Sequence, residues 1–112
     1  MTNDDLWADL VRADGVHEAR SSFADRPALW VDGTEAAHWD GHETLDIRLT
    51  RAVIRARRQE LRADPRVRLR RSSSADWLEV GIRSPGDQAF ALELLQMAVA
   101  AHGAIVGDRP QT

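Results

Sequence analysis

The segment from His38 to Glu43 contains the side chains best suited to chemistry, because it places two imidazoles and two carboxylates within six residues. A metal ion or a general acid–base pair requires such groups. Strand alternation, however, directs His38 toward the apolar layer and leaves His42 at the tip of a turn. The sequence therefore predicts no metal site and a buried, hydrogen-bonded His38. The alternative is a small cofactor-independent enzyme or accessory protein that acts on an apolar metabolite through His38, Glu35 or Asp46.

Arginine is concentrated in the middle of the chain, where residues 48–71 carry ten Arg and two acidic side chains. Four of them fall within a sector about 60° wide on a helical wheel. They are Arg51, Arg55, Arg58 and Arg62. Such a stripe could bind anions, and Arg beside Trp occurs in proteins that bind single-stranded nucleic acid. The sequence pI of about 5.7 disfavours tight non-specific nucleic-acid binding, so a solvated arginine face is the simpler interpretation.

Three of the four Trp residues are predicted to share the face of the sheet that carries no helices. They are Trp30, Trp39 and Trp77, with a polar rim formed by Glu35, Arg48, Arg66, Arg68 and Arg70. Each indole offers roughly 150–250 Å² of surface that ordinarily becomes buried. Three arrangements stay open: arginine stems across the rings, a homodimer, or a platform for a protein partner or an aromatic or anionic ligand. The leading hypothesis is a non-catalytic binding module that uses this surface.

The residues that the chain lacks exclude several classes of protein. It has no Cys, and therefore no disulfide, thiolate nucleophile or Cys-based zinc site. It has no phosphate-binding glycine loop, and Ser72–Ser74 lack the elbow of a serine nucleophile. No cofactor is predicted.

No apolar run approaches the roughly 18 residues that span a bilayer, and the polar N-terminus is unlike a signal peptide. We therefore expect a cytoplasmic protein that does not bind a membrane.

The 112 residues, of which 43% are hydrophobic, suit one α+β domain over residues 1–103 with a flexible tail over 104–112. Periodicity and turn signals predict the order α-β-β-β-β-α-β-β-α. Expected helices cover about residues 3–13, 51–63 and 88–101. Expected strands cover about residues 18–23, 28–31, 34–39, 44–49, 66–71 and 77–83. This order predicts an antiparallel sheet of five to six strands with helices packed on one face.

Two turns fix the expected pairing of the hairpin strands. Asp32-Gly33 predicts a two-residue type I′ turn, and residues 40–43 predict a four-residue loop. The expected partners are Val31 with Thr34, Trp30 with Glu35, Ala28 with Ala37, Trp39 with Thr44 and Glu35 with Arg48. The other set of alternating positions then forms the helix-facing core. It comprises Leu29, Val31, Ala36, His38, Leu45, Ile47, Leu49, Val67, Leu69, Leu78, Val80 and Ile82.

Four short segments form a recognisable set. They are the segment from Ala28 to His38, the segment from Thr44 to Thr50, Asp64-Pro65-Arg66-Val67 and Asp76-Trp77-Leu78. Together they resemble the small actinobacterial proteins called luciferase family or luciferase domain proteins, over roughly residues 10–102. The resemblance assigns no catalytic residue and does not extend to the much larger flavin-dependent luciferases. The order of elements also resembles YjbR-type domains with a frataxin-like sheet, a likeness of topology that implies a binding module by analogy alone.

Overall fold

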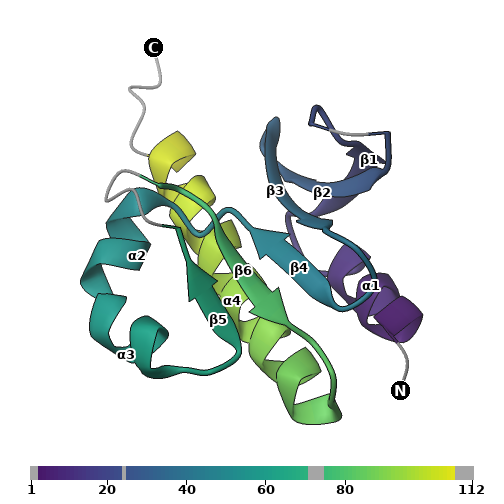
Figure 1. Cartoon of the computed structure of the whole chain (residues 1–112). Helices are drawn as coiled ribbons and strands as arrows, with labels where there is room; N and C mark the ends of the chain where they lie inside the picture. Colours follow the sequence, from purple (N-terminus) through teal and green to yellow (C-terminus); the bar gives the residue numbers. More distant parts are fainter. Residues whose placement is uncertain (1–2, 24, 71–74, 108–112) are drawn as a thin grey trace.

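The protein has the predicted α+β fold, with a six-stranded antiparallel sheet (Figure 1). The computed structural model describes residues 3–23, 25–70 and 75–107. The strands are β1 (His17–Arg20), β2 (Pro27–Val31), β3 (Thr34–Trp39), β4 (Thr44–Ile47), β5 (Val67–Leu69) and β6 (Leu78–Gly81). The helices are α1 (Asn3–Val11), α2 (Arg51–Ala56), α3 (Arg58–Ala63) and α4 (Pro85–Gly107). No helix within the described residues is both long and apolar enough to cross a bilayer.

The sheet has the order β1-β2-β3-β4-β6-β5, so β6 lies between two strands that precede it in the chain. The long helix α4 packs on β2, β3 and β4, α1 packs on α4, and α3 packs on β5 (Figure 1). These helices cover one face of the sheet. We call the opposite face, to which His38, Asp46 and Glu79 belong, the open face.

The core lies between the sheet and the helices, because apolar residues alternate along the central strands. Leu45 and Ile47 of β4 are fully buried on the helix side, and so are Leu78 and Val80 of β6, which pair with them. Leu6, Leu10, Leu94, Leu95 and Ala98 meet them from α1 and α4. The prediction of these core strands is confirmed.

The largest differences between the predicted and observed helices concern the middle and the last helix. The helix expected over residues 51–63 is interrupted at Arg57, which separates α2 from α3. Asp64, with extended backbone angles before Pro65, ends α3 as predicted. The last helix begins earlier than expected, at Pro85, and continues to Gly107. Residues 108–112 of the expected tail lie outside the described residues.

The first hairpin has the predicted turn and an unpredicted bulge. Asp32 and Gly33 both have positive φ, as a type I′ turn requires, and Trp30 pairs with Glu35. The register then shifts by one residue, so Leu29 pairs with Ala37 and Ala28 pairs with His38. The expected pair of Ala28 with Ala37 is therefore wrong. The shift makes Ala36 the extra residue of a β-bulge in β3.

The second hairpin is also displaced by one residue. Trp39 pairs with Leu45 rather than Thr44, and the amide of Asp40 donates to the carbonyl of Thr44 at 2.8 Å. The connecting loop is therefore one residue shorter than predicted, with Gly41 at positive φ. Because a one-residue slip exchanges the two faces of a strand, the predicted faces of β3 from Ala37 to Trp39 are wrong. Glu35 consequently does not pair with Arg48.

The exchange of faces corrects the placement of two side chains. Trp39 lies on the helix side, where its ring centroid is 6.2 Å from that of Trp7 on α1. His38 lies on the open face, paired with Asp46 of β4. The prediction of a hydrogen-bonded His38 is confirmed, but its placement in the helix-facing core is wrong.

Candidate functional site

His38 lies between two carboxylates on the open face. Its Nδ1 is 2.8 Å from Glu35 Oε2, and its Nε2 is 3.1 Å from Asp46 Oδ2. Residues three apart in a regular strand point to opposite faces, so the contact between Glu35 and His38 depends on the bulge between them. Asp46 reaches His38 because the two residues are direct partners on β3 and β4. The bulge and the second hairpin thus assemble this trio.

The carboxylate of Glu35 is anchored by the loop that follows β1. The Ser21 hydroxyl donates to Oε2 at 2.7 Å, and Ser22 donates to Oε1 from its amide at 2.7 Å and from its hydroxyl at 3.1 Å. Burial by itself raises the pKa of Glu35, but these bonds and the one to His38 lower it below its ordinary value. Glu35 is therefore a buried, ionised group with a structural role.

The two carboxylates favour the protonated form of His38. The hydrogen bond to Asp46, the charge of Asp46, and the bond to and charge of Glu35 raise the pKa of His38 above 6.5, although burial alone lowers it. In this form both ring nitrogens donate. A chain of hydrogen bonds therefore runs from Ser21 and Ser22 through Glu35 and His38 to Asp46.

Asp46, at the end of this chain, has one oxygen without a partner. The residue is 5% exposed, and among the described residues no hydrogen-bond donor reaches its Oδ1. A buried polar atom that makes no hydrogen bond costs folding free energy, typically about 1–3 kcal/mol and more for a charged group. Such an atom indicates that a bound molecule could supply the missing donor.

Aromatic rings lie beside the same trio. The centroid of the Trp77 ring is 5.0 Å from that of His38 and 5.7 Å from that of Phe23, which meets Trp77 edge-on at 87°. A cavity of about 440 Å³ opens here. Its lining includes Phe23, His38, Asp46, Arg70, Asp76 and Trp77. We call it the aromatic cavity, because Phe23 and Trp77 form two of its walls. Asp46 adds a buried hydrogen-bond acceptor.

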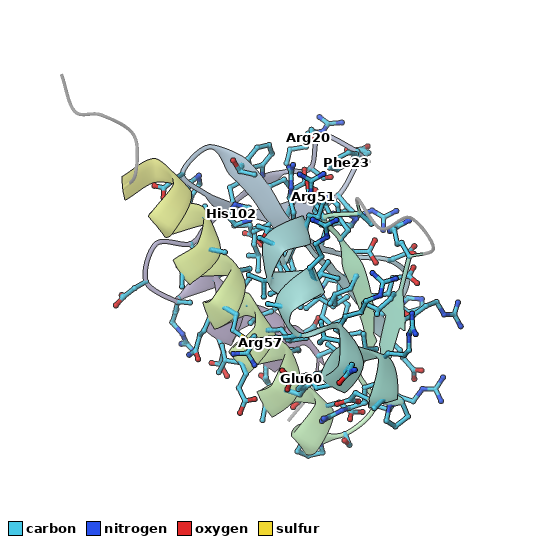
Figure 2. All side chains as sticks on the ribbon, turned by 90° about the vertical axis from the view of Figure 1, so that its left-hand side faces the viewer. Arg20, Phe23, Arg51, Arg57, Glu60 and His102 are labelled. Carbon is cyan, nitrogen blue, oxygen red and sulfur yellow. The ribbon has the colours of Figure 1, made fainter. Side chains whose placement is uncertain are left out.

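Phe23 is the most unusual wall of the aromatic cavity. It lies in the loop after β1, close to Arg20, and its side chain is 65% exposed (Figure 2). It is the one large hydrophobic residue classed as exposed in the part of the chain that the structure describes. Exposure of a large ring beside a cavity is typical of a ligand-contacting position.

Asp76 fixes the position of Trp77. Its backbone carbonyl accepts from the amide of Thr50 at 3.0 Å, and its Oδ1 accepts from the amide of Arg51 at 2.8 Å. Its Oδ2 accepts from the Arg48 guanidinium at 3.2 Å. These bonds attach the segment before β6 to the start of α2, so the indole wall of the cavity is held by the backbone of another element.

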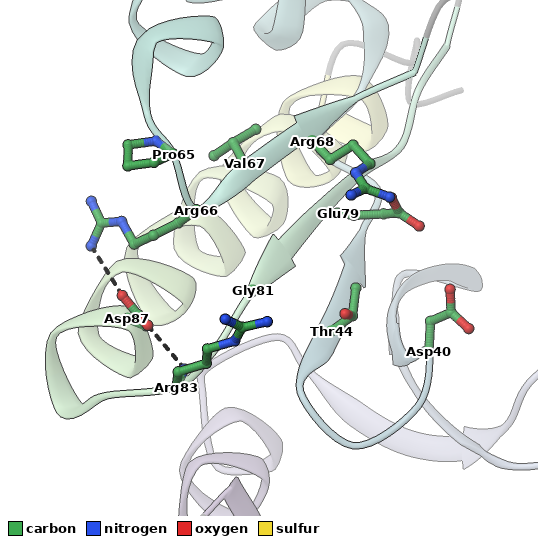
Figure 3. A pocket seen from close by; sticks show the side chains of 10 residues that line it. All are labelled: Asp40, Thr44, Pro65, Arg66, Val67, Arg68, Glu79, Gly81, Arg83 and Asp87. Carbon is green, nitrogen blue, oxygen red and sulfur yellow. Dashed lines mark hydrogen bonds and ion pairs between the residues drawn. The ribbon is translucent and has the colours of Figure 1, made fainter.

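A second cavity, of about 520 Å³, opens beside β5 and β6 (Figure 3). Two of its three basic side chains are already paired: Arg66 with Asp64 at 2.7 Å and with Asp87 at 3.9 Å, and Arg83 with Glu43 at 3.2 Å. The third, Arg68, is the register partner of Glu79, which also lines the cavity. Because most of these charges are satisfied within the chain, we regard this cavity as structural.

Three carboxylates converge on the open face between the two cavities. One oxygen from each of Asp40, Asp46 and Glu79 lies within 4.8 Å of the other two. Within the described residues, this is the group whose spacing could accommodate a metal ion. Acidic clusters are common in proteins that bind no metal, so the spacing alone assigns no site.

The predicted Trp surface does not form as a set. Trp77 lines the aromatic cavity, and Trp30 pairs with Glu35, whereas Trp39 faces the helices. Arg48 is engaged by Asp76. Arg66 is bound by Asp64 and lies 3.9 Å from the centre of the Phe90 ring, so it does not cover an indole.

The predicted arginine stripe is divided by the interruption at Arg57. Arg51 begins α2, and Arg57 pairs with Glu60 at 3.1 Å near the start of α3 (Figure 2). Arg58 and Arg62 line a groove together with Arg68 of β5 and with Arg70, whereas Arg51 and Arg55 do not line it.

The sequence did not single out Ser21, Ser22 or Phe23 as site residues. These three residues were predicted to end a strand over residues 18–23, whereas β1 ends at Arg20 and they lie in the loop that follows it. Nothing in their spacing indicates that this segment folds over β3.

A comparison with protein-family models matches residues 33–98 to the luciferase domain family, which is more than half of the chain. The matched segment contains Glu35, His38, Asp46 and Trp77, whereas the loop that holds Phe23 precedes it. No curated protein and no solved structure gives a significant match.

Proposed function

The chain belongs to the luciferase domain family, and from this premise we propose that its aromatic cavity binds a planar aromatic molecule with an acidic O–H or N–H group. The ring of the ligand packs against Phe23 and Trp77, and its polar hydrogen is donated to Asp46. The protein then acts as a small cofactor-independent acid–base enzyme or as a carrier of such a molecule.

Asp46 carries this proposal, because it lines the aromatic cavity and because no donor among the described residues reaches its buried Oδ1. A ligand O–H or N–H would satisfy this oxygen, and a hydrogen bond to a charged group contributes roughly 1.5–3 kcal/mol. The other oxygen is held by His38, which fixes the orientation of the carboxylate. His38 is thus a positioning residue, and Asp46 is the group that contacts the ligand.

The aromatic walls supply the specificity for a flat ring. Offset or edge-on ring pairs contribute about 0.5–1.5 kcal/mol beyond the area that they bury. Phe23 already meets Trp77 edge-on, and its exposed side can contact a further ring without any change in the core.

The proposal can be tested with 2-naphthol, a planar ring with one acidic hydroxyl whose emission differs between its neutral and ionised forms. We expect saturable binding to the unaltered protein, with emission that shows proton transfer to a carboxylate. Asp46→Asn should weaken binding about tenfold or more and abolish the emission of the ionised form, because it removes the charged acceptor. Phe23→Ala should weaken binding about tenfold, with little loss of stability, because the ring is largely exposed.

Trp30→Phe is the matched control, since Trp30 pairs with Glu35 but does not line the aromatic cavity. It should leave the affinity unchanged. The ether 2-methoxynaphthalene keeps the ring but has no hydroxyl. It should bind to the unaltered protein more weakly than 2-naphthol does, and its affinity should be the same for the unaltered protein and for Asp46→Asn. Absence of saturable 2-naphthol binding, or equal losses in the Trp30 and Asp46 variants, would contradict the proposal.

A further inference from the structure

A groove at the edge of the sheet is lined by four arginines. It has a volume of about 460 Å³ and lies between α3 and the edge strand β5. Arg58 and Arg62 line it from α3, Arg68 lines it from β5, and Arg70 lines it from the position after β5. Val67 and Leu69 complete the lining. We call it the arginine groove. None of the described residues that line it is acidic.

The four guanidinium groups have no ion-pair or hydrogen-bond partner among the residues that the structure describes. Other arginines form salt bridges with acidic side chains: Arg12 with Asp9, Arg20 with Asp25 and Arg57 with Glu60. Glu79 pairs in register with Arg68, yet no ion pair joins their side chains. The contrast is notable in a chain with a net charge of −3, where acids outnumber arginines.

Four cations around one small groove repel one another, and an anion placed between them removes that repulsion. Guanidinium groups bind phosphate through paired N–H donors, which makes arginine better suited than lysine to a fixed geometry. Arg58 and Arg62 are four residues apart on one helix and therefore share a face. Arg68 in β5 and Arg70, which follows β5, line the groove from the other side. Each pair can hold one phosphate from its own side.

We propose that the arginine groove binds a small molecule that carries two linked phosphate groups, one for each arginine pair. A small ligand is favoured over a nucleic acid because a long polyanion would also meet the acidic remainder of the chain, whose pI is about 5.7. Asp46 does not line this groove, and the proposal does not rest on the function proposed for the aromatic cavity, although Arg70 lines both.

Pyrophosphate is the probe that tests the groove, measured by calorimetry on the full chain. The unaltered protein should bind pyrophosphate about tenfold or more tightly than orthophosphate, because two phosphates engage both pairs. The double variant Arg58→Gln, Arg62→Gln should lose tenfold or more of the pyrophosphate affinity. The double variant Arg51→Gln, Arg55→Gln is the matched control, since it removes the same charge from α2, outside the groove, and should stay within about twofold.

Three outcomes would overturn the proposal. Equal losses in the two double variants would show an effect of net charge alone. Equal binding of pyrophosphate and orthophosphate would exclude a site for linked phosphates. Binding of a single-stranded oligonucleotide without binding of pyrophosphate would assign the groove to nucleic acid. Circular dichroism of each variant checks that it is folded, and Arg68→Gln, on the strand side, repeats the test if the helix variant unfolds.

Discussion

The pKa values of His38 and His102 are shifted in opposite directions, because the surroundings of the two side chains differ. His38 faces the acidic groups Glu35 and Asp46, whose hydrogen bonds and charges raise its pKa, and Arg70 and Asp76 line the same cavity. His102, on α4, is buried, and its Nε2 donates to the Arg48 carbonyl at 3.1 Å. Burial lowers the pKa of His102, with the Arg48 charge acting in the same direction and the Arg48 carbonyl, Asp76 and Asp32 opposing it.

These directions predict the pH dependence of stability. A raised pKa means that the contribution of His38 is complete below 6.5 and is lost as the pH rises through its folded-state value. A lowered pKa means that the contribution of His102 is complete above 6.5 and is lost as the pH falls through its folded-state value. We therefore expect His38→Gln to reduce the fall in the free energy of unfolding on the alkaline side of 6.5, and His102→Gln to reduce the fall on the acid side.

Urea unfolding of the unaltered protein and the two variants, repeated at several pH values, measures this dependence. The acid side also contains the loss of Glu35, whose lowered pKa makes its contribution disappear as the pH falls below about 4.5, so the His102 comparison belongs between that value and 6.5. An unchanged alkaline slope in His38→Gln would show that the carboxylates do not hold the imidazolium.

The first hairpin shows what local patterns can and cannot specify about an element. Asp32-Gly33 was sufficient to predict the turn and the pairs next to it, because a type I′ turn accepts few residues. The bulge at Ala36 has no such signal, since Ala36 and Ala37 are both small and apolar and either could be the extra residue. One undetected residue exchanged the faces of His38 and Trp39, so the three indoles that were predicted to share a surface do not do so.

The backbone of this turn predicts the cost of changing Gly33. Its φ is +78°, and a Cβ there would meet no atom within 4 Å, so the cost of Gly33→Ala arises from the backbone alone. We expect the free energy of unfolding to fall by about 1 kcal/mol, because L side chains rarely adopt this conformation. Gly86→Ala is the control: its φ is not positive and its nearest contact, Ser84 Oγ at 3.8 Å, is ordinary. Equal losses in thermal or urea unfolding would contradict this account.

At the scale of the whole molecule, the fold was more predictable than the site. Core strands can be recognised in the sequence by the alternation of apolar and polar residues, as in Leu45, Asp46 and Ile47. One strand with a correctly predicted alternation fixes many contacts in the core. The aromatic cavity, in contrast, joins the loop after β1 to residues of β3, β4 and the start of β6. No local pattern encodes that meeting, because it depends on the register of several strands at once.

The homodimer suggested by the exposed indoles remains a prediction at this scale. Trp39 no longer contributes to it, but Trp77 and the exposed Phe23 form a smaller apolar surface on the open face. If two chains associate through this face, native mass spectrometry should show twice the single-chain mass of 12.5 kDa, and Phe23→Asp should restore the single chain. A strictly monomeric unaltered protein would exclude the dimer and leave the cavity open to small ligands.

Arg70 belongs to the walls of both the aromatic cavity and the arginine groove. A guanidinium drawn toward an occupant on one side is withdrawn from the other, so the two compartments cannot be filled independently. Ligands in the two sites should therefore compete for Arg70. Thermodynamic linkage requires that each ligand lower the affinity of the other by the same factor. A single flexible side chain would thus give this small domain heterotropic communication without any movement of its strands.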